Sequence, residues 1–410
     1  MAAQRDLDLV LLGATGFVGR LIAEHLAEHA PTGTRIALAG RSRERLDELV
    51  TSLGTSASGW PLLVVDTTDD EAVGALARRT RVVATTVGPY LKYGLPVVAA
   101  CAAAGTHYAD LAGESLFVRR VLDEHADAAL ASGARLVHSC GFDSVPSDLS
   151  VLLLAEAARA DGAGTLEETR LVVRSFSGGI SGGTIDSMRT IAMAIASDRS
   201  LAKVVMDPYA LSPDRAAEPD VKLPPDAVPV RRSGTGAWVG PFVMASYNTR
   251  IVRLSNALQD WAYGRTFSYG EELDYGHDML APARAIAVNT GLMAAAGGLA
   301  FGPTRALLDR VLPAPGSGPD ERTRTTGHFT TEVRTRTTSG ARYSCTIRAQ
   351  GDPGYLATSV MFGQSALALA LDADRLPQAS GVLTPATGIG DVLADRLRGQ
   401  GFDIDVVRLD

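Results

Sequence analysis

Short apolar runs alternate with helical patterns over the first 150 residues of the chain. Between the runs, apolar residues recur at the three- and four-residue spacing of an amphipathic helix. The runs, which we interpret as strands, cover residues 9–12, 34–40, 62–66, 81–86, 107–110 and 135–139. Strands that alternate with such helices indicate βαβ units. The pattern therefore predicts an α/β fold whose first domain, residues 1–150, is built on a doubly wound parallel sheet.

The periodicity changes in the second part of the chain. Residues 169–176 alternate apolar and polar side chains, which is typical of a half-buried antiparallel strand. Residues 331–337 and 341–349 alternate in the same way around a short polar turn and predict a β-hairpin. Strands of this kind beside helical segments indicate an α+β domain. We expect this domain over residues 151–358 and expect it to bind substrate or to form a dimer, which leaves a homodimer open.

A glycine-rich turn directly follows the first predicted strand. Gly13 allows the chain to reverse, Gly16 leaves the backbone accessible to phosphate oxygens, and Gly19 lets the next helix pack closely against the strand. The N-terminus of that helix offers unpaired N–H groups and a positive dipole end to an anion. We therefore predict that the first domain is a Rossmann-type dinucleotide-binding domain. Its predicted cofactor loop consists of Gly13, Ala14, Thr15, Gly16, Phe17, Val18 and Gly19.

The end of the second predicted strand indicates which dinucleotide binds. NAD-binding domains usually place an acidic residue there, which accepts hydrogen bonds from the adenosine ribose. This chain has Gly40 at that point, followed by Arg41 and Ser42. A guanidinium and a hydroxyl suit a 2′-phosphate, so we predict NADP(H) as the cofactor and Arg41 and Ser42 as its contacts. Asp66, at the end of the next strand, either caps the following segment or contacts adenine.

The loop after the fourth predicted strand contains Thr86, Gly88 and Pro89. In doubly wound sheets, ligands bind at the carboxyl ends of the strands where the winding reverses. A Gly-Pro turn at that place can run along the nicotinamide side of a cofactor without obstruction by side chains. We therefore add these three residues to the predicted cofactor site.

The proton donor is harder to find, because the chain lacks a common Tyr-Lys pair of NADP-dependent reductases. None of its three lysines has a tyrosine four residues before it. The ionisable groups near predicted strand ends are Tyr90, Tyr93, His107, Tyr108, Asp110, Glu114, His138 and Asp143. Hydride transfer needs a positioned acceptor and electrostatic help at the developing oxyanion, and a Tyr, an Asp or a water can supply the proton. We select Tyr90 and Asp110 as candidate catalytic residues.

Composition excludes several classes of protein. Of the 410 residues, 46% are hydrophobic and 21% are charged, and the net charge is −7. A mildly acidic chain lacks the basic footprint of a nucleic-acid-binding protein. Cys101, Cys140 and Cys345 lie far apart in the sequence, which argues against a disulfide framework and a Cys-based zinc site, and we predict no metal. No apolar signal region precedes the first strand, so we expect a cytoplasmic protein.

Five motifs connect these observations to a known family. They occupy residues 13–19, 39–42, 87–90, 108–114 and 141–148. In this order they resemble the saccharopine dehydrogenase-like oxidoreductases, and within that group they most resemble the trans-acting enoyl reductases, which serve polyketide synthases making long-chain lipids. The similarity extends over nearly the whole chain through residues 248–259, 261–264 and 381–386.

The resemblance has implications for activity and for domain order. It implies NADPH-dependent reduction of an α,β-unsaturated acyl chain that is held on a carrier protein or polyketide synthase, in lipid biosynthesis. It also implies that residues 359–410 return to the Rossmann domain, which makes the second domain an insertion. It supplies no catalytic residue.

Residues 285–304 carry no charge. Twenty residues are long enough to span a membrane, but most of these are Ala and Gly, and Asn289 and Pro303 lie among them. A buried helix, a wall of an acyl tunnel or a peripheral contact with a membrane surface fits this composition better than a span. We prefer the acyl-binding wall, because a lipid chain needs an apolar surface.

Two other functions remain open at this point. A saccharopine-type amino-acid dehydrogenase would need arginines that converge on the substrate carboxylates, and Arg174, Arg189 and Arg250 are available. A non-catalytic, cofactor-binding adaptor at a lipid or membrane surface is favoured by the missing Tyr-Lys pair and by residues 285–304.

Overall fold

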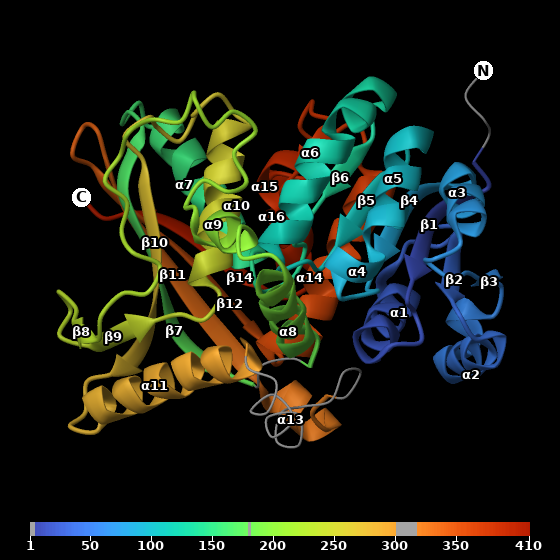
Figure 1. The fold of residues 1–410 in the computed structure, drawn as a ribbon, viewed down its shortest axis with the longest axis horizontal. Helices are drawn as coiled ribbons and strands as arrows, with labels where there is room; N and C mark the ends of the chain where they lie inside the picture. Colours follow the sequence, from blue (N-terminus) through green and yellow to red (C-terminus); the bar gives the residue numbers. More distant parts are fainter. Residues whose placement is uncertain (1–4, 179–181, 301–317) are drawn as a thin grey trace.

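The computed structural model describes residues 5–178, 182–300 and 318–410. These residues form two seven-stranded sheets, one in each half of the view in Figure 1. The strands of the first sheet are β1 (Leu7–Leu12), β2 (Ile36–Gly40), β3 (Leu62–Val64), β4 (Thr80–Thr85), β5 (His107–Asp110), β6 (Arg135–Val137) and β13 (Gly381–Leu383). Every pairing in this sheet is parallel, in the order β13-β6-β5-β4-β1-β2-β3.

Helices cover both faces of the first sheet. On one face α14 (Thr358–Leu371) packs against α1 (Phe17–His29) and strands β1, β4 and β5; on the other, α5 (Leu95–Ala104) packs between α3 (Asp70–Arg79) and α6 (Ser115–Ser132). The side chains of β1 alternate between the two cores: Leu9 and Leu11 join the first, and Val10 and Leu12 join the second. Because both faces are covered, all six residues of β1 are buried, which explains its continuous apolar run.

The strand order places the ligand-binding edge of the first sheet. The order 3-2-1-4-5-6 of the first six strands is that of a doubly wound dinucleotide-binding fold, in which the winding reverses between β1 and β4. The glycine turn follows β1, and the loop of residues 86–89 follows β4. Both motifs therefore lie at the switch point, and the predicted α/β fold class with a second domain is confirmed.

The second sheet is mixed. Its strands are β7 (Leu166–Ser177), β8 (Arg231–Arg232), β9 (Trp238–Pro241), β10 (Ser268–Gly276), β11 (His328–Thr337), β12 (Arg342–Gln350) and β14 (Asp403–Arg408), in the order β14-β12-β11-β7-β10-β9-β8. The predicted hairpin is present as β11 and β12. The strand predicted at 169–176 is the central β7, which is antiparallel to β11 but parallel to β10.

Residues 359–410 contribute to both sheets. Helix α14 packs on the first sheet, and strand β13 pairs with β6 in that sheet. Strand β14, in contrast, pairs with β12 at the edge of the second sheet. The family resemblance implied that this segment returns to the Rossmann domain. The boundary proposed at residue 150 also falls inside one helix, α7 (Val145–Ala160), which runs from the first sheet to pack on β11 and β12. The exact domain limits stay a prediction.

The uncharged stretch expected to form an apolar wall is only partly described. It lies in α11 (Ala281–Ala300), along the lower edge of the view in Figure 1, and residues 301–304 lie outside the described residues. Ile286 and Val288 on this helix are exposed. Within the described ranges, one helical stretch, Pro353–Leu371, is long and apolar enough to cross a membrane, but 78% of it is buried inside the molecule. We therefore interpret that stretch as a core helix.

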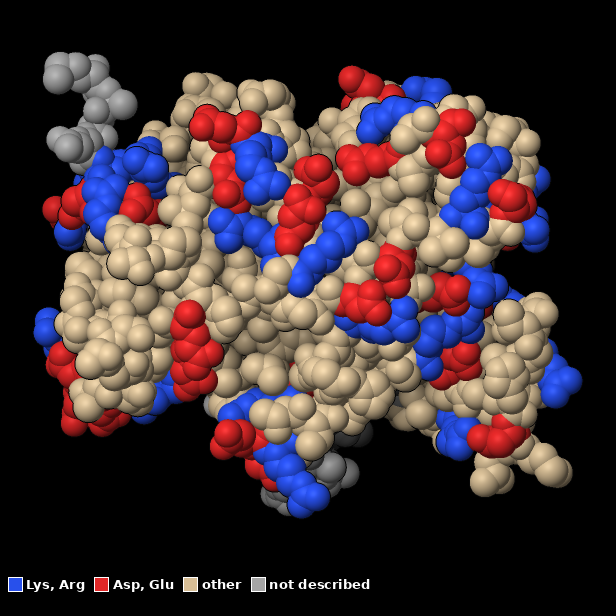
Figure 2. Space-filling view, turned by 180° about the vertical axis from the view of Figure 1, so that it is seen from behind, with Lys and Arg blue, Asp and Glu red and all other residues tan. Residues whose placement is uncertain are grey.

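Charged side chains of both signs are interspersed over the face drawn in Figure 2. Neighbouring charges on the surface form ion pairs such as Arg120–Glu124 on α6 and Arg348–Asp403 between β12 and β14. Such mixing gives a face without an extended field of one sign, so it does not steer a highly charged partner over long distances.

Candidate functional site

The glycine turn has the geometry of a pyrophosphate cradle. Gly13 has φ +87°, which only glycine adopts readily, and an added Cβ there would lie 2.6 Å from the Thr86 hydroxyl. A Cβ on Gly19 would overlap the Gly13 carbonyl oxygen. Gly16 is exposed at the N-cap position of α1, where no side chain caps the helix and no acidic residue occupies the first turn. The N-terminal N–H groups are thus open to an anion, and the residues present fit a dinucleotide.

Thr86 fixes the two strands of the switch point to each other. Its backbone N–H donates to Leu12 O at 2.9 Å, and its hydroxyl donates to Gly13 O at 3.1 Å. The predicted cofactor contact Thr86 therefore holds the glycine turn in place. Gly88, which is exposed, and Pro89 follow it and lead into the short helix α4 (Tyr90–Tyr93).

The end of β2 presents one uncommitted cation. Ser42 caps α2 (Arg43–Leu53) by accepting from Arg45 N at 3.3 Å, and Arg43 pairs with Asp47 on the same helix. Arg41 is exposed and makes no hydrogen bond or ion pair with any residue that the structure describes. Its guanidinium is therefore available to an external anion, as the predicted 2′-phosphate contact requires.

Asp66 closes a local turn after β3. Its Oδ1 accepts from the backbone N–H of Thr68 at 2.9 Å and from the Thr68 hydroxyl at 2.8 Å. These two donors, more than the nearby Arg41 charge, lower the pKa of Asp66. Asp66 thus stabilises the turn that leads to α3, whose N-cap is Asp69, and the adenine contact stays a prediction.

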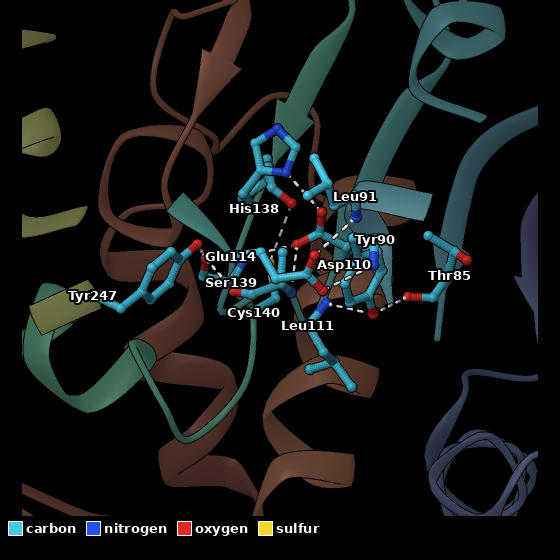
Figure 3. Close-up of polar contacts among 12 residues, drawn as sticks. Thr85, Tyr90, Leu91, Asp110, Leu111, Glu114, His138, Ser139, Cys140 and Tyr247 are labelled. Atoms are coloured by element: carbon cyan, nitrogen blue, oxygen red, sulfur yellow. Dashed lines mark hydrogen bonds and ion pairs between the residues drawn. The ribbon is translucent and has the colours of Figure 1, made fainter. Parts of the chain in front are cut away.

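A buried network lies at the carboxyl ends of β4, β5 and β6 (Figure 3). Glu114, at the N-cap position of α6, accepts from Tyr90 N and Leu91 N at 2.8 Å each. It also accepts from the hydroxyl of Ser187 at 2.7 Å. Ser187 belongs to α8 (Gly182–Ser197), a helix of the second domain. Glu114 therefore joins the loop after β4 to the second domain, and its burial raises its pKa.

The phenol of Tyr90 braces two strand ends. Its hydroxyl donates to Thr85 O and accepts from Leu111 N, both at 3.1 Å, and the side chain is 5% exposed. Burial and the charge of Asp110 raise the pKa of Tyr90 well above its ordinary value. The hydroxyl is thus already engaged on both sides by backbone groups.

Both carboxylate oxygens of Asp110 have polar partners. Its Oδ1 accepts from Ala112 N at 3.0 Å and from Ser139 N at 2.8 Å, and its Oδ2 lies 2.6 Å from His138 Nδ1. The side chains of Asp110 and His138 are fully buried. The structure therefore brings both candidate catalytic residues, Tyr90 and Asp110, into one network, where each holds backbone in place. Their catalytic role stays a prediction.

Ser139 ties the end of β6 to the second domain. It has φ +67°, a conformation that is uncommon for a residue other than glycine. Its hydroxyl donates to Ala112 O at 2.8 Å and lies 2.6 Å from the hydroxyl of Tyr247 on α10 (Ala245–Ala257). Burial raises the pKa of Tyr247 well above its ordinary value. Sequence reasoning missed Ser139, Tyr247 and Ser187, because each acts through a partner far away in the chain.

Asp143, in the loop between β6 and α7, differs from its neighbours. It makes no hydrogen bond or ion pair with any residue in the described part of the chain, and it retains some exposure. The surrounding packing alone raises its pKa from 3.8 to about 6. The sequence did place this residue among the ionisable groups near strand ends, but gave no reason to prefer it.

Comparison with known proteins places the chain in a family. Residues 9–137 match the family model of the saccharopine dehydrogenase NADP-binding domain. A Mycobacterium tuberculosis protein is 51% identical over 418 residues, covering 100% of this chain and 99% of its own. A Mycobacterium bovis protein is 49% identical and covers 99% of each chain. A Mycobacterium ulcerans protein is 48% identical and covers 100% of this chain and 99% of its own. Both of these proteins are named trans-acting enoyl reductase. The chain belongs to the trans-acting enoyl reductase family.

A solved structure shares the fold of this chain. Apo saccharopine dehydrogenase (L-Glu forming) from Saccharomyces cerevisiae superimposes with a TM-score of 0.55 over 98% of this chain and 99% of its own, at 16% identity. At that identity the likeness shows the fold alone. The family and its NADP-binding domain make the chain an NADP-dependent oxidoreductase, and the cofactor prediction is confirmed.

Proposed function

We propose that this protein is an NADPH-dependent enoyl reductase that acts in trans on an α,β-unsaturated acyl chain held by a separate carrier protein or polyketide synthase. The observation that carries the proposal is identity of about 50% over full length to proteins named trans-acting enoyl reductase. The cradle at the switch point supports it, because it fits the dinucleotide that such a reaction consumes.

NADPH, when bound, supplies the hydride. The chain would bind and orient it: the turn of residues 13–19 would hold the pyrophosphate at the N-terminus of α1, and Arg41 and Ser42 would hold the 2′-phosphate. Residues 86–89 would line the nicotinamide side at the switch point. We assign Tyr90 and Asp110 positioning roles, since their polar atoms are engaged by Thr85, Leu111, Ala112, Ser139 and His138.

Helices α8 and α11 are our proposed contact for the acyl chain. Helix α8 touches the site through the bond from Ser187 to Glu114 and packs on α11. Apolar side chains are exposed on both helices, with Met193 at 47% and Ile286 at 57%. An apolar surface that begins beside the site suits a hydrocarbon chain that extends away from a reacting thioester.

The arginines considered for an amino-acid substrate are used inside the protein. Arg174 pairs with Asp274 at 2.9 Å and Glu332 at 2.6 Å, Arg189 pairs with Asp186 at 2.8 Å, and Arg250 pairs with Asp226. Each guanidinium is already neutralised by an acid of its own chain. This supports the acyl substrate over saccharopine, whose carboxylates would need free cations.

The test is NADPH oxidation, followed by the nicotinamide absorbance, with a crotonyl or longer 2-enoyl thioester on a carrier protein. Saccharopine is assayed alongside with NADP⁺, and a saturated acyl thioester serves as the blank. We expect oxidation only with the unsaturated thioester, with one saturated product formed per NADPH consumed. Turnover of saccharopine, or of neither substrate across carriers and chain lengths, would overturn the proposal.

A further inference from the structure

We propose that Asp143 is the catalytic acid that protonates the substrate carbon once hydride has been added. The inference rests on the proposed function, because it assigns a residue to the second half of the same reduction. It is carried by the placement of an unpartnered carboxyl group at the ligand-binding edge of the first sheet.

The loop that carries Asp143 faces the site. It follows β6, and the carboxyl ends of parallel strands meet at one edge of a sheet, so the loop lies at the same edge as residues 86–89 and Asp110. The bond from the Ser139 hydroxyl to Ala112 O joins this loop to the loop after β5. Asp143 is thus on the substrate side of the fold.

The residues on either side of Asp143 are fixed. Phe142 N donates to the hydroxyl of Thr358 at 3.0 Å. The Phe142 ring packs edge-on against the Phe329 ring, with 4.8 Å between the ring centroids. The hydroxyl of Ser144 donates to Asn248 Oδ1 at 3.0 Å. The backbone therefore holds Asp143 between two anchored neighbours, while its own carboxyl group stays free.

Two other enclosed carboxyl groups, those of Asp148 and Glu271, are hydrogen-bonded. Asp148, on α7, accepts from Ser255 and from Ala386 N at 2.8 Å, and Glu271, on β10, accepts from Asn248 at 3.0 Å and Tyr269 at 2.8 Å. Asp143 has no such donors. Its partial exposure leaves the carboxyl group accessible to a substrate that enters the site.

The protonation state of Asp143 suits an acid. Enclosure raises its pKa to about 6, so part of the population carries a proton near neutral pH. Tyr247, on α10 of the second domain, interacts electrostatically with Asp143, and Asp110 at the end of β5 and Glu114 in the loop after it act on the same Tyr247. The cause resolved for Asp143 itself is its enclosure, without a cation that would favour the carboxylate.

The step balances without a further reagent. Bound NADPH would supply a hydride to the β carbon and thereby be oxidised to NADP⁺, and the C=C electron pair would move onto the thioester carbonyl as an enolate. The carboxyl group of Asp143 then gives its proton to the α carbon, which completes the saturated thioester. The resulting carboxylate takes a proton from water through its exposed side.

The test compares Asp143→Asn with Asp148→Asn, a buried carboxyl on α7 whose pKa is also about 6 but which is hydrogen-bonded. We expect Asp143→Asn to lower kcat by about 10²–10⁴-fold, with NADPH affinity by fluorescence within twofold of the wild type. The rate of the wild type should fall as the pH rises above about 6, and the rate of Asp143→Asn should not show this fall. The rate of Asp148→Asn, expressed per folded molecule, should still show it.

A second readout uses the protein without cofactor or substrate. In ¹³C-aspartate NMR, one carboxyl signal that titrates near pH 6 should disappear in Asp143→Asn, and a midpoint below pH 4.5 would overturn the proposal. A wild type that reduces enoyl thioesters beside an Asp143→Asn variant of equal kcat and equal pH profile overturns the role of Asp143 alone. A wild type that reduces none overturns the proposed function itself.

Discussion

The loops after β1 and β2 are built in a different way from the loops after β5 and β6. After β1 and β2, the backbone makes the site: glycines open the turn, a helix N-terminus faces it, and Arg41 stands free beside it. After β5 and β6, side chains make it: Glu114, Asp110 and Ser139 bind backbone groups and two residues of the second domain. The backbone features after β1 and β2 come from short stretches of sequence, whereas the side-chain contacts after β5 and β6 form only when both domains are folded.

The largest loss of stability and of NADPH binding should follow a substitution in the glycine turn. A Gly19→Ala variant places its Cβ on the Gly13 carbonyl oxygen, so α1 must shift, and we expect a loss of about 3 kcal/mol or more in stability together with loss of NADPH binding. Thermal unfolding and NADPH fluorescence measure both. Gly59→Ala, whose Cβ meets nothing within 4 Å, should change neither.

Gly16→Ala separates folding from binding in the same turn. Its Cβ would lie 3.3 Å from Gly13 O, in an exposed position, so the fold should survive while the pyrophosphate is kept off the backbone. Unchanged NADPH affinity in a folded Gly16→Ala protein would contradict the cradle.

Glu114→Gln tests the side-chain contacts after β5. An amide has one oxygen, so its NH₂ group must face Tyr90 N or Leu91 N, and we expect about 1–3 kcal/mol of destabilisation with a fall in kcat/KM as the loop after β4 moves. Ser187→Ala removes only the contact with the second domain and should have about half that effect on stability. Equal effects in urea unfolding would show that the two backbone contacts contribute nothing.

Arg41→Ala should weaken NADPH binding about 10- to 100-fold, because one charge-assisted contact is worth about 1.5–3 kcal/mol. NADH affinity should change less than threefold, since NADH lacks the 2′-phosphate. Arg43→Ala is the matched control, because Arg43 is already paired with Asp47. Equal losses for both cofactors in isothermal titration would remove Arg41 from the phosphate site.

The change expected for Asp143→Asn is a gain in stability and not a loss. The pKa of Asp143 is raised to about 6 in the folded protein, so its contribution to stability is full below about pH 4 and is lost as the pH rises through about 6. Asp143→Asn should therefore be more stable than the wild type at pH 8, by about 1–3 kcal/mol, and the gain should vanish by pH 4. A variant that is less stable at pH 8 would show a hidden partner for the carboxylate.

The same contrast explains what the sequence could predict. The glycine turn, the cation after β2 and the alternation of strands with helices are local patterns, and the structure has these elements at the expected places in the chain. The second-domain partners of Glu114 and Ser139 lie 73 and 108 residues away, and no periodicity links them. Likewise, β14 alternates as an ordinary strand, but only its pairing with β12 shows which sheet it joins.

The placement of β13 and β14 bears on how the protein is made. Strand β13 closes the edge of the first sheet and β14 the edge of the second, so both edges stay open until residues 381–408 have left the ribosome. The Rossmann half cannot finish folding ahead of the other half, although it is synthesised first. Nascent chains halted before residue 381 carry two unpaired strand edges, β6 and β12, and are therefore exposed to aggregation.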